Sequence, residues 1–318
     1  MKPVTLLKKL FKYGVVILVL GTLLSLTWLR WESHQPRDEW IAGGQGKLVD
    51  VSQERGTTPF GQLTEALTLQ SDTGLSVNIR LIRDKHSDEP RTVLLVLGGH
   101  RTGRDAVDLF GDTGEWAVIG VDYPYDGPEK VRGAGQTLST LPKARAAFRD
   151  TVPAVFLVLD WLEQQAWVDE RRIIIVGGSL GVPFAASVAA LDERITSAML
   201  VHGAADNRLW AEAQVARRID TRFLHYPLSV LINWLAYGPI HDTAKHVAMI
   251  SPRPVLIVGA RDDERTPAGQ AELLFDLAGD PKRLRFTDGQ HIEPDRIEVI
   301  AALLAIAREE EVFLTEIP

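Results

Sequence analysis

The sequence predicts an α/β fold in which helices flank both faces of a mostly parallel sheet, with a helical cap insertion and one N-terminal transmembrane helix. Three observations predict it. Along residues 63–310, short β-branched segments alternate with amphipathic ones, as strands alternate with crossover helices. A G-x-S-x-G motif at residues 177–181 lies between one such strand and a helix. An uninterrupted apolar run at residues 13–29 comes before the rest of the chain.

The N-terminal residues predict a single-pass membrane anchor. With two further apolar residues before it, the run at 13–29 approaches the roughly 20 residues that cross a bilayer. Trp28 and Trp31 at its end suit a membrane interface better than the small residues of a cleavage site. A cleaved signal peptide and a buried helix are the alternatives. Positive charge before the run predicts a cytoplasmic N-terminus and an extracytoplasmic or periplasmic main domain; the lysines are Lys2, Lys8, Lys9 and Lys12.

Composition excludes several classes of function. The chain has 318 residues, 45% of them hydrophobic and 24% charged, so a compact core is expected. A net charge of −7 argues against nucleic acid as a partner, because phosphate binding needs clustered positive charge. The absence of cysteine excludes disulfides, thiolate nucleophiles and zinc–thiolate sites. The sequence does not reveal the oligomeric state.

Three regions follow one another in the predicted organisation. Residues 1–31 form the cytoplasmic stub and anchor, residues 32–61 a polar, glycine-bearing tether, and residues 62–318 the α/β domain. An antiparallel hairpin over 63–70 and 75–83 is expected to open the domain. Short apolar runs then predict buried parallel strands, and a more polar run predicts a last strand: 92–97, 116–121, 172–176, 196–201, 254–258 and 283–287.

Helices are predicted between these strands, at residues 142–165, 182–191, 267–278 and 294–310. Pro153 is expected to kink or split the first of them. Residues 207–249 interrupt the alternation with five aromatic residues among helix formers. They are interpreted as a cap over the site, the alternative being an ordinary pair of packing helices.

Ser179 is the candidate nucleophile. The β-branched run 172–176 leads directly into the motif, and an alanine-rich helix follows it. This strand–turn–helix setting is the one a nucleophile elbow requires. Gly177 and Gly181 allow strand and helix to approach closely while the serine adopts a strained conformation. The alternative is a serine in a plain strand-to-helix turn.

The glycine-rich turn after strand 92–97 is the candidate oxyanion hole. Gly98 and Gly99 allow backbone N–H groups to face a developing oxyanion, and the N–H of Leu180 would be the second donor. The first donor is left open between His100, which is preferred, and Arg101. The alternative is that this glycine-rich segment is an ordinary tight turn that binds no ligand. Gly99, Arg101 and Tyr123 are expected to contact the substrate.

An acid and a base complete the predicted site. An acidic turn follows strand 254–258, and Asp262 is the preferred orienting carboxylate, with Asp263 as the second choice. His291 lies on the loop after the last strand, where its imidazole can take and return the serine proton. His202 is interpreted as a core histidine. No metal-ligand pattern is present, so neither metal nor organic cofactor is expected.

Residues 63–310 resemble the α/β-hydrolase superfamily, especially its dienelactone-hydrolase, acetyl-esterase and prolyl-oligopeptidase-like branches. The matching pieces are residues 98–100, 177–181, 259–262 with Pro267, and 289–291. The chain order Ser179, Asp262, His291 is the order of that family. Residues 121–125 also resemble the segment that closes the family's following strand. The Gly98-Gly99 pair replaces the family's common His-Gly turn, and the doubled acid leaves the third triad member open.

These observations predict a serine hydrolase that cleaves carboxylic esters of small molecules through an acyl-enzyme. A peptidase or thioesterase of the same fold is one alternative. The other is a non-catalytic, membrane-tethered binding protein on a hydrolase fold. The motifs do not identify the acyl or alcohol group of the substrate.

Overall fold

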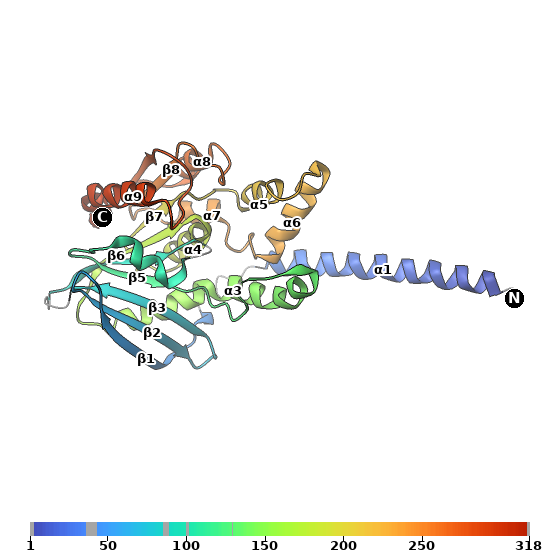
Figure 1. Cartoon of the computed structure of the whole chain (residues 1–318), viewed down its shortest axis with the longest axis horizontal. Helices are drawn as coiled ribbons and strands as arrows, with labels where there is room; N and C mark the ends of the chain where they lie inside the picture. The colour runs from blue at the N-terminus through green and yellow to red at the C-terminus, as the bar shows by residue number, and fades with distance from the viewer. Residues whose placement is uncertain (1–2, 36–42, 85–88, 100–101, 129, 317–318) are drawn as a thin grey trace.

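A computed structural model describes residues 3–35, 43–84, 89–99, 102–128 and 130–316. A globular domain holds the sheet, and the N-terminal helix projects from it as a long rod (Figure 1). The elements in chain order are α1 (Pro3–Ser33), β1 (Leu48–Thr57), β2 (Leu63–Ser71), β3 (Ser76–Arg83), β4 (Arg91–Leu97), η1 (Gly103–Phe110), β5 (Ala117–Val121), α3 (Gly133–Leu162), β6 (Val168–Gly178), η2 (Ser179–Gly181), α4 (Val182–Leu191), β7 (Ser197–Val201), α5 (Asn207–Ala216), η3 (Arg222–Leu224), α6 (His225–Leu235), α7 (Thr243–Met249), β8 (Val255–Ala260), α8 (Gln270–Leu277), β9 (Lys282–Thr287), α9 (Ile297–Glu309) and α10 (Glu311–Thr315).

Nine strands of the described chain form one sheet in the order β1-β2-β3-β5-β4-β6-β7-β8-β9. The first three strands and the β3–β5 pair are antiparallel, and every pair from β5 across to β9 is parallel. The predicted hairpin, the buried parallel strands and the mostly parallel sheet are therefore confirmed. Because the parallel strands all end at one edge, the loops that follow them meet there.

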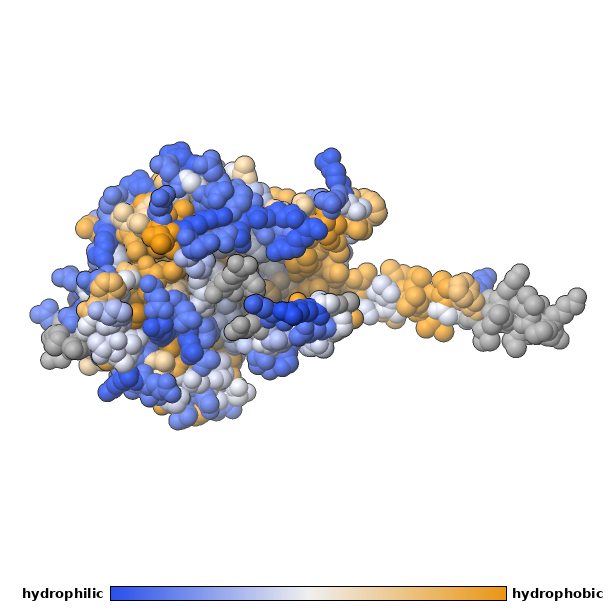
Figure 2. All heavy atoms as spheres, viewed as in Figure 1, coloured by the Kyte–Doolittle hydropathy of each residue, from blue (hydrophilic) through white to orange (hydrophobic). Residues whose placement is uncertain are grey.

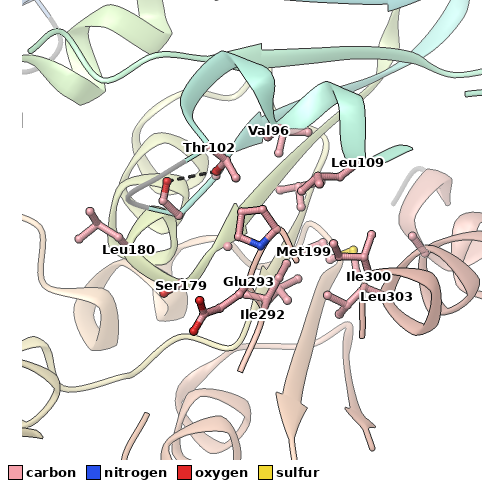
Figure 3. Close-up of a pocket in the computed structure, with 18 of the residues that line it drawn as sticks. Val96, Thr102, Leu109, Ser179, Leu180, Met199, Ile292, Glu293, Ile300 and Leu303 are labelled. Carbon is pink, nitrogen blue, oxygen red and sulfur yellow. Dashed lines mark hydrogen bonds between the residues drawn. The ribbon is translucent and has the colours of Figure 1, made fainter. Parts of the chain in front are cut away.

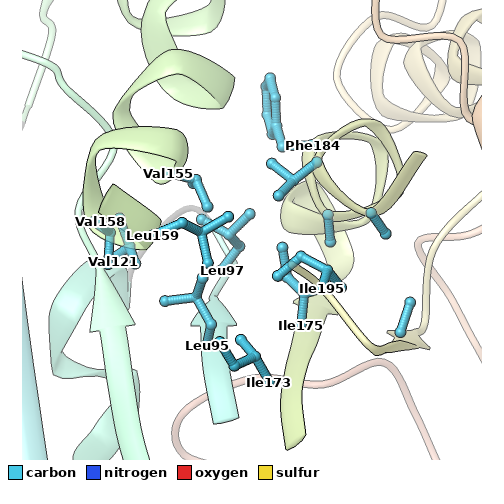
Figure 4. Packing of buried hydrophobic residues seen from close by; sticks show 14 of the residues in the cluster. Leu95, Leu97, Val121, Val155, Val158, Leu159, Ile173, Ile175, Phe184 and Ile195 are labelled. Carbon is cyan, nitrogen blue, oxygen red and sulfur yellow. The ribbon is translucent and has the colours of Figure 1, made fainter. Parts of the chain in front are cut away.

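Two apolar layers cover the sheet. On one face, alternate strand residues such as Leu95, Leu97 and Ile175 pack against α3, α4, α7 and α8 (Figure 4). On the other face, the intervening residues, among them Leu94 and Ile174, pack against η1, α9 and α10. Strands buried on both faces need continuous apolar runs, and this is why these strands could be predicted from the sequence.

The predicted tether is wrong for part of its length. Residues 48–57 form β1, the edge strand, which pairs with β2 from Thr57↔Leu63 to Leu48↔Ser71. Most of β1 is exposed. An edge strand that buries few side chains needs no alternating apolar pattern. Because residues 48–57 are mostly polar, the sequence pattern did not predict this strand.

Helix α3 also differs from its prediction. It begins at Gly133, well before the predicted start, and continues to Leu162 with Pro142 and Pro153 inside it. The helix is therefore not split at Pro153. The second half of α3 is almost entirely buried against the sheet, and this packing supplies far more stabilisation than one missing helical hydrogen bond removes.

Helix α1 is long and apolar enough over Phe11–Ser33 to cross a membrane, and only 6% of its most apolar window is buried in the protein. This exposure does not fit the alternative of a buried core helix. Its C-terminal end is held by the domain: Glu32 accepts hydrogen bonds from Arg145 at 2.6 Å and from the Tyr237 hydroxyl at 3.1 Å. The Arg145 guanidinium also lies over the rings of Trp28 and Tyr237.

The region interpreted as a cap contains four helical segments with two different surroundings. Helices α5 and α6 pack against each other, and α6 also contacts α1. Helix α7 packs against α4 and contributes Val247 to the main core, so it belongs to the α/β layers.

His241, between α6 and α7, is a buried histidine that affects stability at acidic pH. Its ring packs edge-on against Phe184 at 4.9 Å, and its Nε2 atom donates to the carbonyl oxygen of Phe148 at 3.0 Å. Burial, followed by repulsion from His246, lowers the pKa of His241 to about 3. In the unfolded chain a histidine has a pKa of about 6.5. Between these values the unfolded state binds a proton that the folded state does not, so stability falls as pH falls through this window.

We expect His241→Gln, which retains a side-chain donor, to weaken this pH dependence. Between pH 7 and 5 the wild-type chain should lose about 2 kcal/mol more unfolding free energy than the variant does. Urea unfolding of the full-length chain in detergent, followed by tryptophan fluorescence at both pH values, measures the difference. Equal losses in the two proteins would exclude His241 as a source of acid sensitivity.

Candidate active site

Ser179 lies at a sharp turn between β6 and α4. Its φ angle is 53°, in the left-handed region that non-glycine residues rarely occupy. A Cβ atom on Gly177 would lie 2.6 Å from the Cβ of Ala185, and one on Gly181 would lie 2.1 Å from the carbonyl oxygen of Leu97. Both motif glycines are therefore required by close packing, and the turn raises the serine side chain above the sheet edge.

His291 contacts both Ser179 and an acidic residue. Its Nε2 atom is 2.7 Å from the Ser179 hydroxyl oxygen, and its Nδ1 atom is 3.0 Å from each carboxylate oxygen of Asp263. A carboxylate only accepts hydrogen bonds, so the neutral ring carries its proton on Nδ1 and leaves Nε2 free to accept from the serine hydroxyl. The His291 side chain is 1% exposed and that of Asp263 is 10% exposed. Chemically, such a hydrogen-bonded chain can act as a nucleophile, a base and an orienting acid.

Asp263, and not Asp262, is the residue that contacts His291. The preferred choice of Asp262 is corrected by the turn that follows β8, which two backbone hydrogen bonds hold against the end of β9 and the loop after it. The N–H of Arg261 donates to Thr287 O and that of Asp262 to Gly289 O, each at 3.0 Å. In this turn Asp262 is exposed, while the Asp263 carboxylate faces the histidine.

The acidic turn is stabilised as an anion. Burial by itself would raise the pKa of Asp263, but the hydrogen bond and charge of His291 and the backbone N–H groups of Thr266 and Arg265 outweigh it, and the net pKa is lowered. Glu264 is held similarly: it accepts from the backbone N–H of His291 at 3.1 Å and from Arg296 at 3.0 Å. Two carboxylates therefore hold His291, one by its ring and one by its backbone.

His202 is a supporting residue whose role sequence reasoning missed. As predicted, it is buried with its polar atoms satisfied, but its partners connect it to the site. Its Nδ1 atom accepts from the N–H of Ile292 at 2.9 Å, and its Nε2 atom donates to Thr287 at 3.0 Å. Burial, and then repulsion from His291, lower the pKa of His202 to about 4, so it is neutral at pH 7. It thereby fixes the backbone next to His291, a contact across two loops that no local pattern indicates.

The loop after β4 faces Ser179 at Gly99. A Cβ atom built on Gly99 would lie 3.8 Å from the Cβ of Ser179. Thr102 closes the turn, because its N–H and hydroxyl both donate to the Gly99 carbonyl oxygen. Leu180, the other predicted oxyanion residue, follows Ser179 directly in η2. His100 and Arg101 lie outside the described residues.

Tyr123 contacts both the loop after β4 and helix α4. Its hydroxyl donates to the carbonyl oxygen of Gly98 at 2.7 Å, and its ring packs against Phe184. Burial raises the pKa of the Tyr123 hydroxyl, so it stays protonated and remains a donor. Tyr123 thus supports the loop after β4, and substrate contact by Tyr123 stays a prediction. Asp122 supports the loop too, accepting from the N–H of Arg104 at 2.7 Å.

A cavity of about 520 Å³ adjoins Ser179 (Figure 3). Gly99 and Leu180 line it, and so does α5 of the predicted cap through Trp210 and Gln214. Charged groups gather at this side: Arg217 donates to Glu264 O, and Arg265 pairs with Glu293. Most of the remaining lining is apolar. The site can therefore hold a largely hydrophobic molecule with one reactive end at the serine.

A second cavity of about 240 Å³ lies between α3, α5 and α6. Phe148, Leu180 and Trp210 line both cavities, so these side chains separate the second cavity from the first. Arg145, which holds Glu32 of α1, lines the second cavity as well. The region around Ser179 and the end of the apolar helix are therefore neighbouring parts of the fold.

Within the described part of the chain, His202, Asp263 and His291 form the one group of ligand-type atoms close enough to hold a metal ion, all within 4.8 Å of one another. Their hydrogen bonds already use these atoms: Nδ1 of His202 accepts from Ile292, and His291 bonds Asp263 and Ser179. The donor set therefore fits proton transfer better than metal binding.

Comparison with known proteins agrees with this geometry. Residues 145–291 match the family model described as the prolyl oligopeptidase family. The matched region contains Ser179, Asp263 and His291. The chain is also 29% identical over 170 residues to the uncharacterised protein YfhR of Salmonella typhimurium, a match covering 51% of this chain and 53% of that protein. The chain thus spans about half the length of the curated relatives it matches.

Solved structures of three esterases are similar over most of the chain. An acetyl xylan esterase from Paenibacillus sp. R4 has a TM-score of 0.61 at 16% identity, covering 85% of this chain and 92% of its own. Acetyl xylan esterase 1 from Thermoanaerobacterium sp. has a TM-score of 0.58 at 17% sequence identity. The match covers 84% of this chain and 92% of that esterase. A cold-adapted esterase from an Arctic intertidal metagenomic library has a TM-score of 0.56 at 17% sequence identity. The match covers 82% of this chain and 99% of that esterase. At these identities the likeness shows a shared fold.

Proposed function

We propose that this chain, which has the α/β-hydrolase fold, is a serine hydrolase that cleaves carboxylic esters through an acyl-enzyme. One observation carries the proposal: the Ser179 hydroxyl lies 2.7 Å from Nε2 of His291, whose Nδ1 atom bonds the carboxylate of Asp263. Such a connected nucleophile, base and acid is expensive to maintain without use, because a strained serine and a buried charged residue both cost stability.

The proposed mechanism has two halves. Ser179 attacks the ester carbonyl while His291 takes its proton, and the imidazolium that forms is stabilised by Asp263. His291 then returns the proton to the departing alcohol. Water attacks the acyl-enzyme in the same manner, with His291 again as base. The N–H of Leu180 and one N–H of the loop after β4 would hold the oxyanion.

A peptidase of the same fold is the second candidate, favoured by the family match over residues 145–291. A peptidase that recognises an amine terminus needs an available acid near the serine. Glu293 lines the cavity, but Arg265 and Arg296 already pair with it. The apolar lining and this neutralised acid support an ester over a peptide substrate. A thioester differs little from an ester here, and parallel assays of the two distinguish them.

We also propose that α1 anchors the domain as an uncleaved, single-pass helix with a cytoplasmic N-terminus and an extracytoplasmic domain. The helix forms an apolar rod, and the apolar surface continues onto the adjoining end of the domain, where α6 lies (Figure 2). Phe223 and Tyr226, on η3 and α6, are 79% and 62% exposed. Aromatic side chains at such a position suit a membrane interface.

We expect a fluorophosphonate probe to label the wild-type chain at one serine, because the probe reacts with activated serines. Ser179→Ala should remain unlabelled, while Ser139→Ala, a change at an exposed helical serine of α3, should label like the wild type. In-gel fluorescence and mass spectrometry of the labelled peptide measure this. An unlabelled wild-type chain would favour the binding-protein alternative over the enzyme.

A further inference from the structure

The cavity beside Ser179 extends far from the serine, into the layer between the sheet and α9. Side chains from four elements converge on it: Val96 of β4, Leu109 of η1, Met199 of β7, and Ile300 and Leu303 of α9 (Figure 3). At its far end Ala307 of α9 lines it, together with Trp116. A pocket shaped only for an acetyl group would need no such depth.

The strand register gives the length of this channel. Ile174 of β6 and its partner Leu94 of β4 line the cavity, and Ser179 follows five residues after Ile174. Five residues of strand span about 16 Å. On the opposite wall, Ile300 and Ala307 are seven helical residues apart, about 10 Å along α9. A zigzag hydrocarbon chain advances a little less than its bond length of about 1.5 Å per bond, so the channel is long enough for about ten to twelve carbon atoms.

The interior of the channel is apolar. At its far end the polar groups of two lining residues bond each other: Trp116 Nε1 donates to a carboxylate oxygen of Glu311 at 2.6 Å. The charged lining residues, Arg217, Arg265 and Glu293 among them, belong to the segments beside the serine. Water is held in a cavity only by several polar partners, so a channel of this kind is suited to hydrocarbon.

We propose that this channel binds the acyl chain of medium- to long-chain fatty acid esters, a proposal that rests on the proposed ester hydrolysis. The polarity of the two sides assigns the two parts of the substrate. The acyl chain occupies the apolar channel, and the alcohol lies on the polar side, from which it departs before water enters. The acetyl xylan esterases that share the fold are, by contrast, described as acting on acetyl groups.

A chain-length series tests this proposal on the full-length protein in detergent, with p-nitrophenyl esters from acetate to palmitate. Each added methylene that enters the channel should improve kcat/KM about fourfold, up to about twelve carbons. Ala307→Phe places a ring in the far end of the channel and should lower the laurate-to-butyrate ratio of kcat/KM at least tenfold. Ala305→Phe makes the same change two residues earlier on the exposed face of α9 and should retain the wild-type ratio.

Each result decides between the two proposals. If the wild-type chain hydrolyses acetate best and its activity declines steadily with chain length, the acyl channel is wrong and ester hydrolysis stands. A wild-type ratio in folded Ala307→Phe would also overturn the channel. If no ester is cleaved and no fluorophosphonate reacts, the proposed function itself fails. Should Ala307→Phe not fold, Leu304→Ala, which widens the channel, serves instead: its optimum should move to longer chains, and an unchanged optimum contradicts the channel.

Discussion

Ser179→Ala is expected to lower kcat for an activated ester by roughly 10⁵- to 10⁶-fold, the scale at which a nucleophile contributes in serine hydrolases. The residual rate would come from substrate binding and the oxyanion donors alone. His291→Ala should cause a similar loss, because an unassisted serine hydroxyl is a poor nucleophile at neutral pH. Steady-state kinetics on p-nitrophenyl butyrate, with each variant's fold checked by circular dichroism, measures both losses.

The double variant Ser179→Ala, His291→Ala is the control for this prediction. Because the two residues act as one unit, it should be no slower than either single variant. Losses that add, or a single variant that keeps more than about a tenth of the wild-type rate, would contradict the assignment of the 2.7 Å contact as the catalytic one.

Asp263→Asn is expected to lower kcat by about 10³- to 10⁴-fold with little change in KM. An asparagine amide can donate to Nδ1 of His291, which favours the ring tautomer that cannot accept the serine proton. The change also removes the negative charge that stabilises the imidazolium in the transition state. Initial-rate kinetics over a range of ester concentrations separates kcat from KM.

Asp262→Asn is the matched control, because it makes the same chemical change one residue earlier on the exposed side of the turn. Its kcat should stay within about threefold of the wild-type value, as expected for a surface substitution. The reverse pattern, with Asp262→Asn inactive and Asp263→Asn active, would show that the loop rearranges in the working enzyme and that Asp262 is the orienting acid.

Much of this site could be predicted because its signals are local. The β-branched strand, two glycines around Ser179 and an alanine-rich helix occupy one short segment, and the close contacts at Gly177 and Gly181 explain why those glycines stand there. The strand before the acidic turn and the loop that carries His291 are similarly local. Buried parallel strands can be predicted because their sequences are unbroken apolar runs.

The choice between Asp262 and Asp263, by contrast, could not be predicted from a local sequence pattern. Both residues suit the chemistry, and which one faces His291 depends on the turn after β8, held by backbone hydrogen bonds to Thr287 and Gly289. Strand β1 was not predicted because hydrogen bonds to the backbone of β2, and not its own side chains, hold it in the sheet. His202 likewise acquires its role from Ile292, ninety residues further along the chain.

By itself, the sequence determined the order and type of the buried elements, the serine and histidine of the site, and the apolar helix at the N-terminus. It could do so because each depends on the chemistry of neighbouring residues. The tertiary structure alone decided which acid meets His291, that Tyr123 supports the loop from behind, and that an apolar channel runs from Ser179 along α9. These features arise where separate elements pack together, and the shape of the space between them depends on distances that no single segment contains.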